Sequence, residues 1–160
     1  MNDETAELLF DVVGRLEINI LARECPAIVV LQGERLLALS DYDYLRDDQT
    51  AAAFEERAAA KAREIDATRW VLAVPQVWMI TSDAIMSRAV SNHPLREGEQ
   101  EAITWMSYDR QDGVDYGRVP YTRRPNGEPI FDEPEIITVG VQPEESMPGR
   151  TLLEEFQRDG

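Results

Sequence analysis

The chain of 160 residues is poor in the residues that build disulfides and metal centres. It holds one cysteine, Cys25, and one histidine, His93. A single thiol cannot form an internal disulfide, which is typical of proteins from a reducing compartment. One imidazole and one thiol also exclude a zinc site of familiar spacing within one chain. A chain of this length can bury a hydrophobic core without disulfides or bound metal ions. We therefore expect one domain over residues 1–160, with its core in about residues 5–142 and a peripheral segment 143–160.

Long hydrophobic runs are also missing. The longest apolar stretch, around Val71 to Ile80, is far shorter than the roughly 20 residues that a membrane-spanning helix needs. The N-terminal residues Met1 to Glu4 are acidic where a secretory segment would carry positive charge. These absences predict a cytoplasmic protein with no membrane partner.

Positive charge is scarce, and Lys61 is the only lysine. The chain carries 16 basic residues against 31 Asp and Glu, a net charge of −15. Residues 1–50 hold 11 acids and 4 bases, and residues 101–160 hold 13 and 6, which leaves −7 on each; residues 51–100 carry −1. Direct binding of nucleic acid is disfavoured, because affinity for its backbone needs clustered Lys and Arg. Two interpretations of the acidity stay open: solubility, or carboxylates that imitate phosphates towards a nucleic-acid-binding partner.

Hydrophobic periodicity predicts two main helices, 5–22 and 50–66, and a short terminal helix over 151–158. Pro75 implies a bulge or an edge position within its strand, because proline cannot donate to a ladder. Residues 82–99 are expected to form an irregular or briefly helical connection. Strands are expected at 27–31, 34–39, 69–81, 101–109 and 115–122, with Ile136 to Val139 as the last strand.

The order α-β-β-α-β-β-β-(β)-α, with hairpins in place of crossovers, predicts the α+β class. We expect an antiparallel sheet of about five to six strands, with the two main helices packed on one face as a two-layer sandwich. The side chains that periodicity places on inward faces are Leu9, Val13, Leu16, Phe54, Ile65, Trp78 and Trp105.

Short motifs in the second half are Val74-Pro75-Gln76-Val77-Trp78, then His93 to Glu97 running into Glu101-Ala102-Ile103, then the turn Arg110–Gly113. With these, the chain resembles a group of small uncharacterised bacterial and phage proteins over roughly residues 10–140. Where that group has an acid before its tryptophan pair, this chain has Gln76. The resemblance implies an α+β fold and no activity.

Three arginines, interleaved with tyrosines, form a locally basic patch: Arg118, Arg123 and Arg124. Guanidinium and aromatic groups suit an anion or the acidic segment of a partner. The alternative is cross-strand pairing with the acids that follow, which are also candidate contacts for a basic partner: Glu128, Asp132, Glu133 and Glu135.

No catalytic or cofactor motif is present, since GxGxxG, Walker A and Gly-x-Ser-x-Gly patterns are all missing. Asp41 to Asp48 superficially resembles a calcium loop, but Arg46 stands in place of the sharp-turn glycine. His93 with Glu97, Glu99 and Glu101 could hold a divalent metal or supply an acid and a base. We expect an ordinary surface loop there, and therefore no metal and no cofactor.

Three function classes remain. Charge favours a non-enzymatic acidic interaction protein, of phage or mobile-element origin, that binds a protein with a basic surface; in its sharpest form it is a nucleic-acid mimic that inhibits its partner. The second class is a small hydrolase that works from loop 93–101. The third is a structural or assembly subunit held by an exposed sheet edge, and the sequence leaves a homo-oligomer open.

Overall fold

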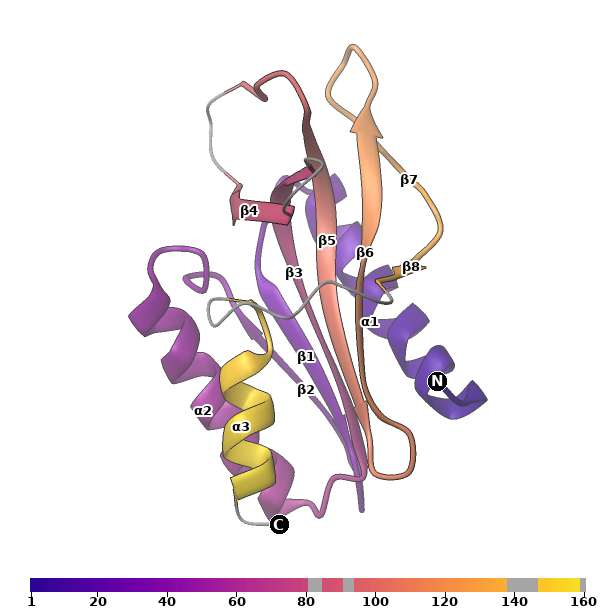
Figure 1. The fold of residues 1–160 in the computed structure, drawn as a ribbon, viewed down its shortest axis with the longest axis vertical. Coiled ribbons are helices and arrows are strands. Elements are labelled where there is room, and N and C mark those ends of the chain that lie inside the picture. The colour runs from indigo at the N-terminus through magenta and orange to yellow at the C-terminus, as the bar shows by residue number, and fades with distance from the viewer. Residues whose placement is uncertain (81–84, 91–93, 138–146, 159–160) are drawn as a thin grey trace.

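The computed structural model describes residues 1–80, 85–90, 94–137 and 147–158 (Figure 1). The helices in these ranges are α1 (Asp3–Leu21), α2 (Asp48–Glu64) and α3 (Arg150–Arg158). The strands are β1 (Ala27–Gln32), β2 (Leu36–Asp41), β3 (Arg69–Ile80), β4 (Ile85–Ala89), β5 (Glu99–Asp109), β6 (Gly113–Arg123), β7 (Pro129–Phe131) and β8 (Glu135–Ile136). The predicted α+β class is confirmed, and the element order is broadly as predicted, with additional short strands between α2 and α3.

The strands form one antiparallel sheet in the order β2-β1-β3-β5-β6-β7, with β4 paired to the end of β3 and β8 paired to β6. The sheet is larger than predicted, because the connection expected to be irregular contains β4. Of the expected last strand 136–139, only Ile136 lies in a strand among the described residues: it ends β8 and pairs with Gly117, whereas Ile137 follows the strand. Thr138 and Val139 lie outside the described residues.

Helices cover both faces of the sheet, which corrects the expected two-layer arrangement. Val29 and Leu31 of β1 pack in one core with α2 and α3, whereas Ile28 and Val30 pack in a second core with α1. Figure 1 shows α1 on the opposite side of the sheet from α2 and α3. The physical reason lies in the strands, since Ala27–Leu31 is apolar without alternation, as expected of a strand buried on both faces.

The seven side chains predicted to face inward are all buried, with exposed fractions of 4% or less. Each main helix begins at a side-chain cap. Asn2 Oδ1 accepts a hydrogen bond from the Thr5 N–H at 2.9 Å before α1, and Asp47 Oδ1 accepts one from the Thr50 N–H at 2.7 Å before α2. Such caps satisfy N–H groups that a helix leaves unpaired at its first turn.

Pro75 lies within β3 without a bulge in the β3–β5 ladder, where it pairs with Ile103 in an unbroken register. On the other side of β3, pairing with β1 ends at Ala73 and pairing with β4 begins at Gln76. Pro75 therefore stands at the point where β3 changes partners, and its missing N–H costs no ladder bond there. The alternative of a local edge position, and not the bulge, fits the structure.

Helix α3 is anchored more firmly than the expected peripheral position implies. Leu152 is fully buried in the core that α2 shares with the sheet. The carboxylate of Glu55 in α2, itself 3% exposed, accepts hydrogen bonds from the Tyr44 hydroxyl at 2.6 Å and the Leu152 N–H at 3.0 Å. None of the described helices is long and apolar enough to cross a membrane.

Candidate functional site

The four acids proposed for a basic partner lie at and beyond the end of β6, and all are exposed. Glu128 follows the turn around Gly127, which adopts a positive φ of 92°. Asp132 and Glu133 lie in the connection between β7 and β8, and Glu135 lies in β8. These acids therefore lie along the β6 edge of the sheet, from the β6–β7 turn at Glu128 to Glu135, which pairs with Arg118 in the middle of β6.

Two of the three arginines of the predicted basic patch are engaged within the chain. Arg118 Nε donates to Glu135 Oε2 at 3.1 Å, and its guanidinium lies over the Trp78 ring, 5.4 Å from the centroid. Arg123 Nε donates to Glu101 Oε2 at 2.7 Å. Arg124 has an exposed side chain. Cross-strand pairing therefore accounts for Arg118, and little of the patch is left for an anion.

Helix α1 brings a further carboxylate to the connection between β7 and β8. Burial raises the pKa of Glu17, and the neighbouring negative charge of Glu133 raises it further. Within the described part of the chain, neither carboxylate forms an ion pair with a basic group. We call Glu17, Asp132 and Glu133 the acidic face. The two acidic segments predicted from the sequence, 1–50 and 101–160, come together at this point, where Glu17 of the first lies close to Glu133 of the second.

An apolar stripe runs along the outward side of α1. Phe10, Ile18 and Leu21 are 57%, 69% and 56% exposed, although their neighbours on the helix are buried in the core. With Gly14, they recur at steps of three and four residues and so share one side of the helix. Periodicity assigned α1 an inward face, but these outward side chains form a second pattern that the sequence analysis missed.

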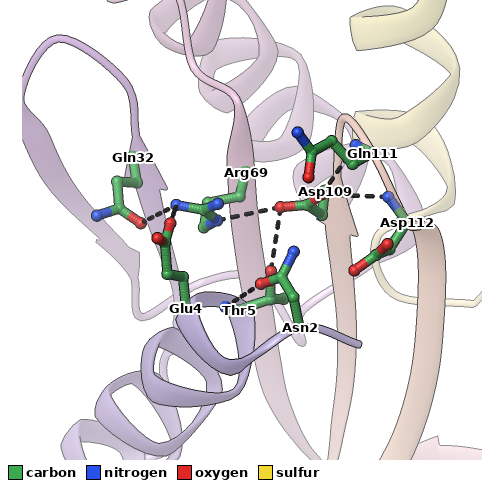
Figure 2. A network of polar contacts seen from close by, with 8 residues as sticks. All are labelled: Asn2, Glu4, Thr5, Gln32, Arg69, Asp109, Gln111 and Asp112. Atoms are coloured by element: carbon green, nitrogen blue, oxygen red, sulfur yellow. Dashed lines mark hydrogen bonds and ion pairs between the residues drawn. The ribbon is translucent and has the colours of Figure 1, made fainter.

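A network of polar contacts ties the start of α1 to the ends of β3 and β5 (Figure 2). Asp109 Oδ2 accepts from the Thr5 hydroxyl and from Arg69 Nε, each at 3.2 Å. Arg69 Nη1 also lies 2.7 Å from Glu4 Oε2 and donates to Gln32 Oε1 at 3.2 Å.

The other carboxylate oxygen of Asp109 binds the turn between β5 and β6. Asp109 Oδ1 accepts from the backbone N–H groups of Gln111 and Asp112, at 2.8 and 3.1 Å (Figure 2). Hydrogen bonds from Asn2, from this turn and from Arg69 outweigh burial and hold the pKa of Asp109 at about 2. A hollow of about 590 Å³ opens beside these residues. Both oxygens of Asp109 are already used, so we interpret the network as a structural clamp.

Two of the three acids in the loop proposed for hydrolysis pair with arginines, Glu99 with Arg88 and Glu101 with Arg123, whereas Glu97 is exposed. His93 lies outside the described residues. Glu99 accepts from Arg88 at 2.8 and 3.0 Å, and these bonds, with one from the Arg96 N–H, lower its pKa to about 2. A general acid needs the opposite shift. No group of three His, Cys, Asp or Glu side chains suited to a metal is found within the described ranges.

The three tryptophans belong to the interior, since Trp70, Trp78 and Trp105 are 0%, 3% and 0% exposed. Burial raises the pKa of the Cys25 thiol, which makes it a poor nucleophile. Neither group therefore adds to the candidate surface. Comparison with protein-family models, with curated proteins and with solved structures gives no match for this chain.

Proposed function

We propose that this chain is a non-enzymatic acidic interaction protein that binds a basic protein partner through the acidic face and the apolar stripe of α1. The observation that carries the proposal is the juxtaposition of Glu17 and Glu133. Burial raises the pKa of Glu17 most, and the negative charge of Glu133 beside it raises that pKa further. Repulsion of this kind costs free energy that a partner's Arg or Lys between the two carboxylates would relieve.

The apolar stripe gives such a partner something besides charge to bind. Phe10, Ile18 and Leu21 are each more than half exposed on the same helix as Glu17. Buried apolar side chains supply affinity at protein interfaces, while charges at the rim steer association. The combination suits an amphipathic basic segment of a protein better than a free small cation. A nucleic-acid-binding protein is one partner of this chemistry, which makes nucleic-acid mimicry the sharpest form of the proposal.

A charge reversal tests the acidic face. The variant Glu17→Lys/Asp132→Lys/Glu133→Lys inverts it and leaves Glu135 in place, because Glu135 holds Arg118. The matched control reverses three exposed acids elsewhere: Glu34→Lys/Asp43→Lys/Glu56→Lys. Both variants change net charge equally, so a difference between them reports on position and not on total charge.

The measurement is capture from the native host by immobilised protein, at low and at high salt, followed by mass spectrometry and direct binding of the retained protein. We expect wild type and control to retain a basic protein at low salt and the reversed variant to lose it. High salt or competing duplex DNA should displace this protein from wild type. If salt displaced the retained protein but duplex DNA did not, the partner would still be a basic protein and nucleic-acid mimicry would be rejected. Equal capture by wild type and the reversed variant would reject the acidic face.

A further inference from the structure

The outer edge of β2 is open within the part of the chain that the structure describes. β2 ends the strand order, and within the described residues only β1 pairs with it. Exposed edges in native proteins are usually blunted by Lys, Pro or a bulge. The segment Leu36–Asp41 contains no basic residue and no proline, and its register with β1 is unbroken. An edge of this kind is suited to pairing with a further strand.

The hairpin fixes which backbone groups point outward. The Gly33 N–H donates to the Arg35 carbonyl at 3.1 Å, and these two residues continue the β1–β2 register. In an antiparallel ladder, residues alternate between those that point both polar groups at the partner strand and those that point both away. Residues 37, 39 and 41 therefore face β1, whereas the N–H and C=O groups of Leu36, Ala38 and Ser40 face the open edge.

We propose that β2 pairs with β2 of a second copy of this chain, antiparallel, with Ala38 opposite Ala38 on the twofold axis. This register sets Leu36 opposite Ser40 and brings together only residues whose polar groups face outward. Three such pairs give about six backbone hydrogen bonds. The same register sets Arg35 opposite Asp41, an attractive cross-strand pair that occurs twice by symmetry.

Side chains on both faces of β2 fit this register. On the face that packs towards α2, it sets Leu37 opposite Leu39, and both are partly buried against the core that α2 covers. On the other face, a hollow of about 300 Å³ between α1 and β2 is lined in part by Ile18, Ala38 and Ser40. Leu36 of the second copy, which is 54% exposed in one chain, would stand beside this hollow.

The charges near β2 differ from those of the acidic face, and they favour a second copy of this chain over a basic strand as the partner of this edge. Near β2 the charges are balanced, since Asp41 lies 3.4 Å from Arg57 and Arg35 lies 3.9 Å from Glu64. A basic strand gains little from such a surface, whereas a second copy supplies the matching Arg35 and Asp41. Two chains of −15 nevertheless repel each other at long range. Salt should therefore strengthen dimerisation and weaken the binding of a basic partner.

Analytical ultracentrifugation of the full chain, over a range of protein and salt concentrations, tests the proposal. We expect a reversible dimer that salt favours. The variant Ala38→Glu sets two carboxylates against each other on the axis and should weaken dimerisation by at least about tenfold. The control Ala53→Glu adds the same charge at an exposed position of α2 and should leave the dimer intact.

A disulfide keeps the proposal testable if Ala38→Glu fails to fold. In a Cys25→Ser background, Ala38→Cys should crosslink two chains on mild oxidation, because paired Cα atoms about 5.5 Å apart allow a disulfide. Ala53→Cys should not crosslink. A chain that stays monomeric at all salt concentrations, or a dimer that Ala38→Glu leaves unchanged, overturns the proposal. Neither result bears on the acidic face, whose reversal leaves β2 untouched.

Discussion

The substitution Asp109→Asn tests whether the network at the start of α1 is a structural clamp. Asparagine keeps one oxygen that can accept from the turn at Gln111 and Asp112. It replaces Oδ2, which accepts from Thr5 and Arg69, by an NH₂ group that cannot accept from either. The side chain of Asp109 is 4% exposed, so water compensates little for the loss.

The magnitude follows from the pKa of Asp109. Burial alone would raise the pKa, but the hydrogen bonds outweigh it and hold the pKa at about 2, against an ordinary 3.8. Because the folded state favours the charged form, this stabilisation is present above the unfolded value and is lost as the pH falls towards 2. The difference is worth about 2.5 kcal/mol at full strength.

Urea unfolding, followed by far-ultraviolet circular dichroism at pH 7 and pH 3, measures both effects. At pH 7 we expect Asp109→Asn to lower the free energy of unfolding by about 2–3 kcal/mol, because Arg69 loses one buried partner but keeps Glu4. Between pH 7 and pH 3 the variant should lose less stability than wild type. The control Asp43→Asn, at an exposed position, should behave as wild type. If Asp109→Asn were as stable as wild type at pH 7, the clamp interpretation would be refuted.

Three further substitutions test the packing. Trp78→Ala should lower the free energy of unfolding by about 3–5 kcal/mol in urea, because it removes a buried ring whose Nε1 donates to Thr104 Oγ1 at 2.7 Å; a loss under about 1 kcal/mol would contradict this. Gly117→Ala should cost about 1–3 kcal/mol, since its Cβ would stand 1.8 Å from a backbone oxygen of β8; an unchanged melting temperature would contradict the β6–β8 pairing. Burial raises the pKa of Glu55, so wild type should lose stability as the pH rises above 4.5 through that raised value. Glu55→Gln should abolish this decline, and a decline that persists in the variant would assign it to another group.

The sequence predicted the elements well where local chemistry decides them. Asn2 and Asp47 act as caps, and the apolar positions of α1 and α2 recur with helical spacing, so both helices begin and end within about two residues of the expected bounds. The turn before Gly113, whose φ is 80°, follows from the conformational freedom of glycine. These features depend on neighbours along the chain.

The features that the sequence did not predict depend on partners distant in the chain. β4 is short, and Ile85–Ala89 gains its strand conformation by pairing with the end of β3. The two helix layers follow from the fully buried run Trp70–Val74, which has no polar side chain to mark a solvent face. A continuous apolar run indicates burial on both faces, so the sequence of β3 itself favours helices on both sides of the sheet.

The candidate sites divide in the same way. Glu128, Asp132 and Glu133 were identified because they cluster along the chain, but Glu17 joins them only through the contact of α1 with the end of the sheet. The outward stripe of α1 was missed because one periodic face already accounted for that helix. Its outward positions interrupt the acidic surface with exposed apolar side chains, among them Ile18 at 69%.

Opposite responses to salt separate the two proposed surfaces without any substitution. Binding of a basic partner depends on attraction between unlike charges, so it weakens as the Debye length falls from about 30 Å at 0.01 M to about 8 Å at 0.15 M. Pairing of two β2 edges must overcome repulsion between chains of −15 each, so it strengthens over the same range. A titration of the wild-type chain that follows mass and partner binding together therefore tests each surface against the other. If both responses had the same sign, one contact would be serving both associations, and the acidic face and the β2 edge would no longer be separate sites.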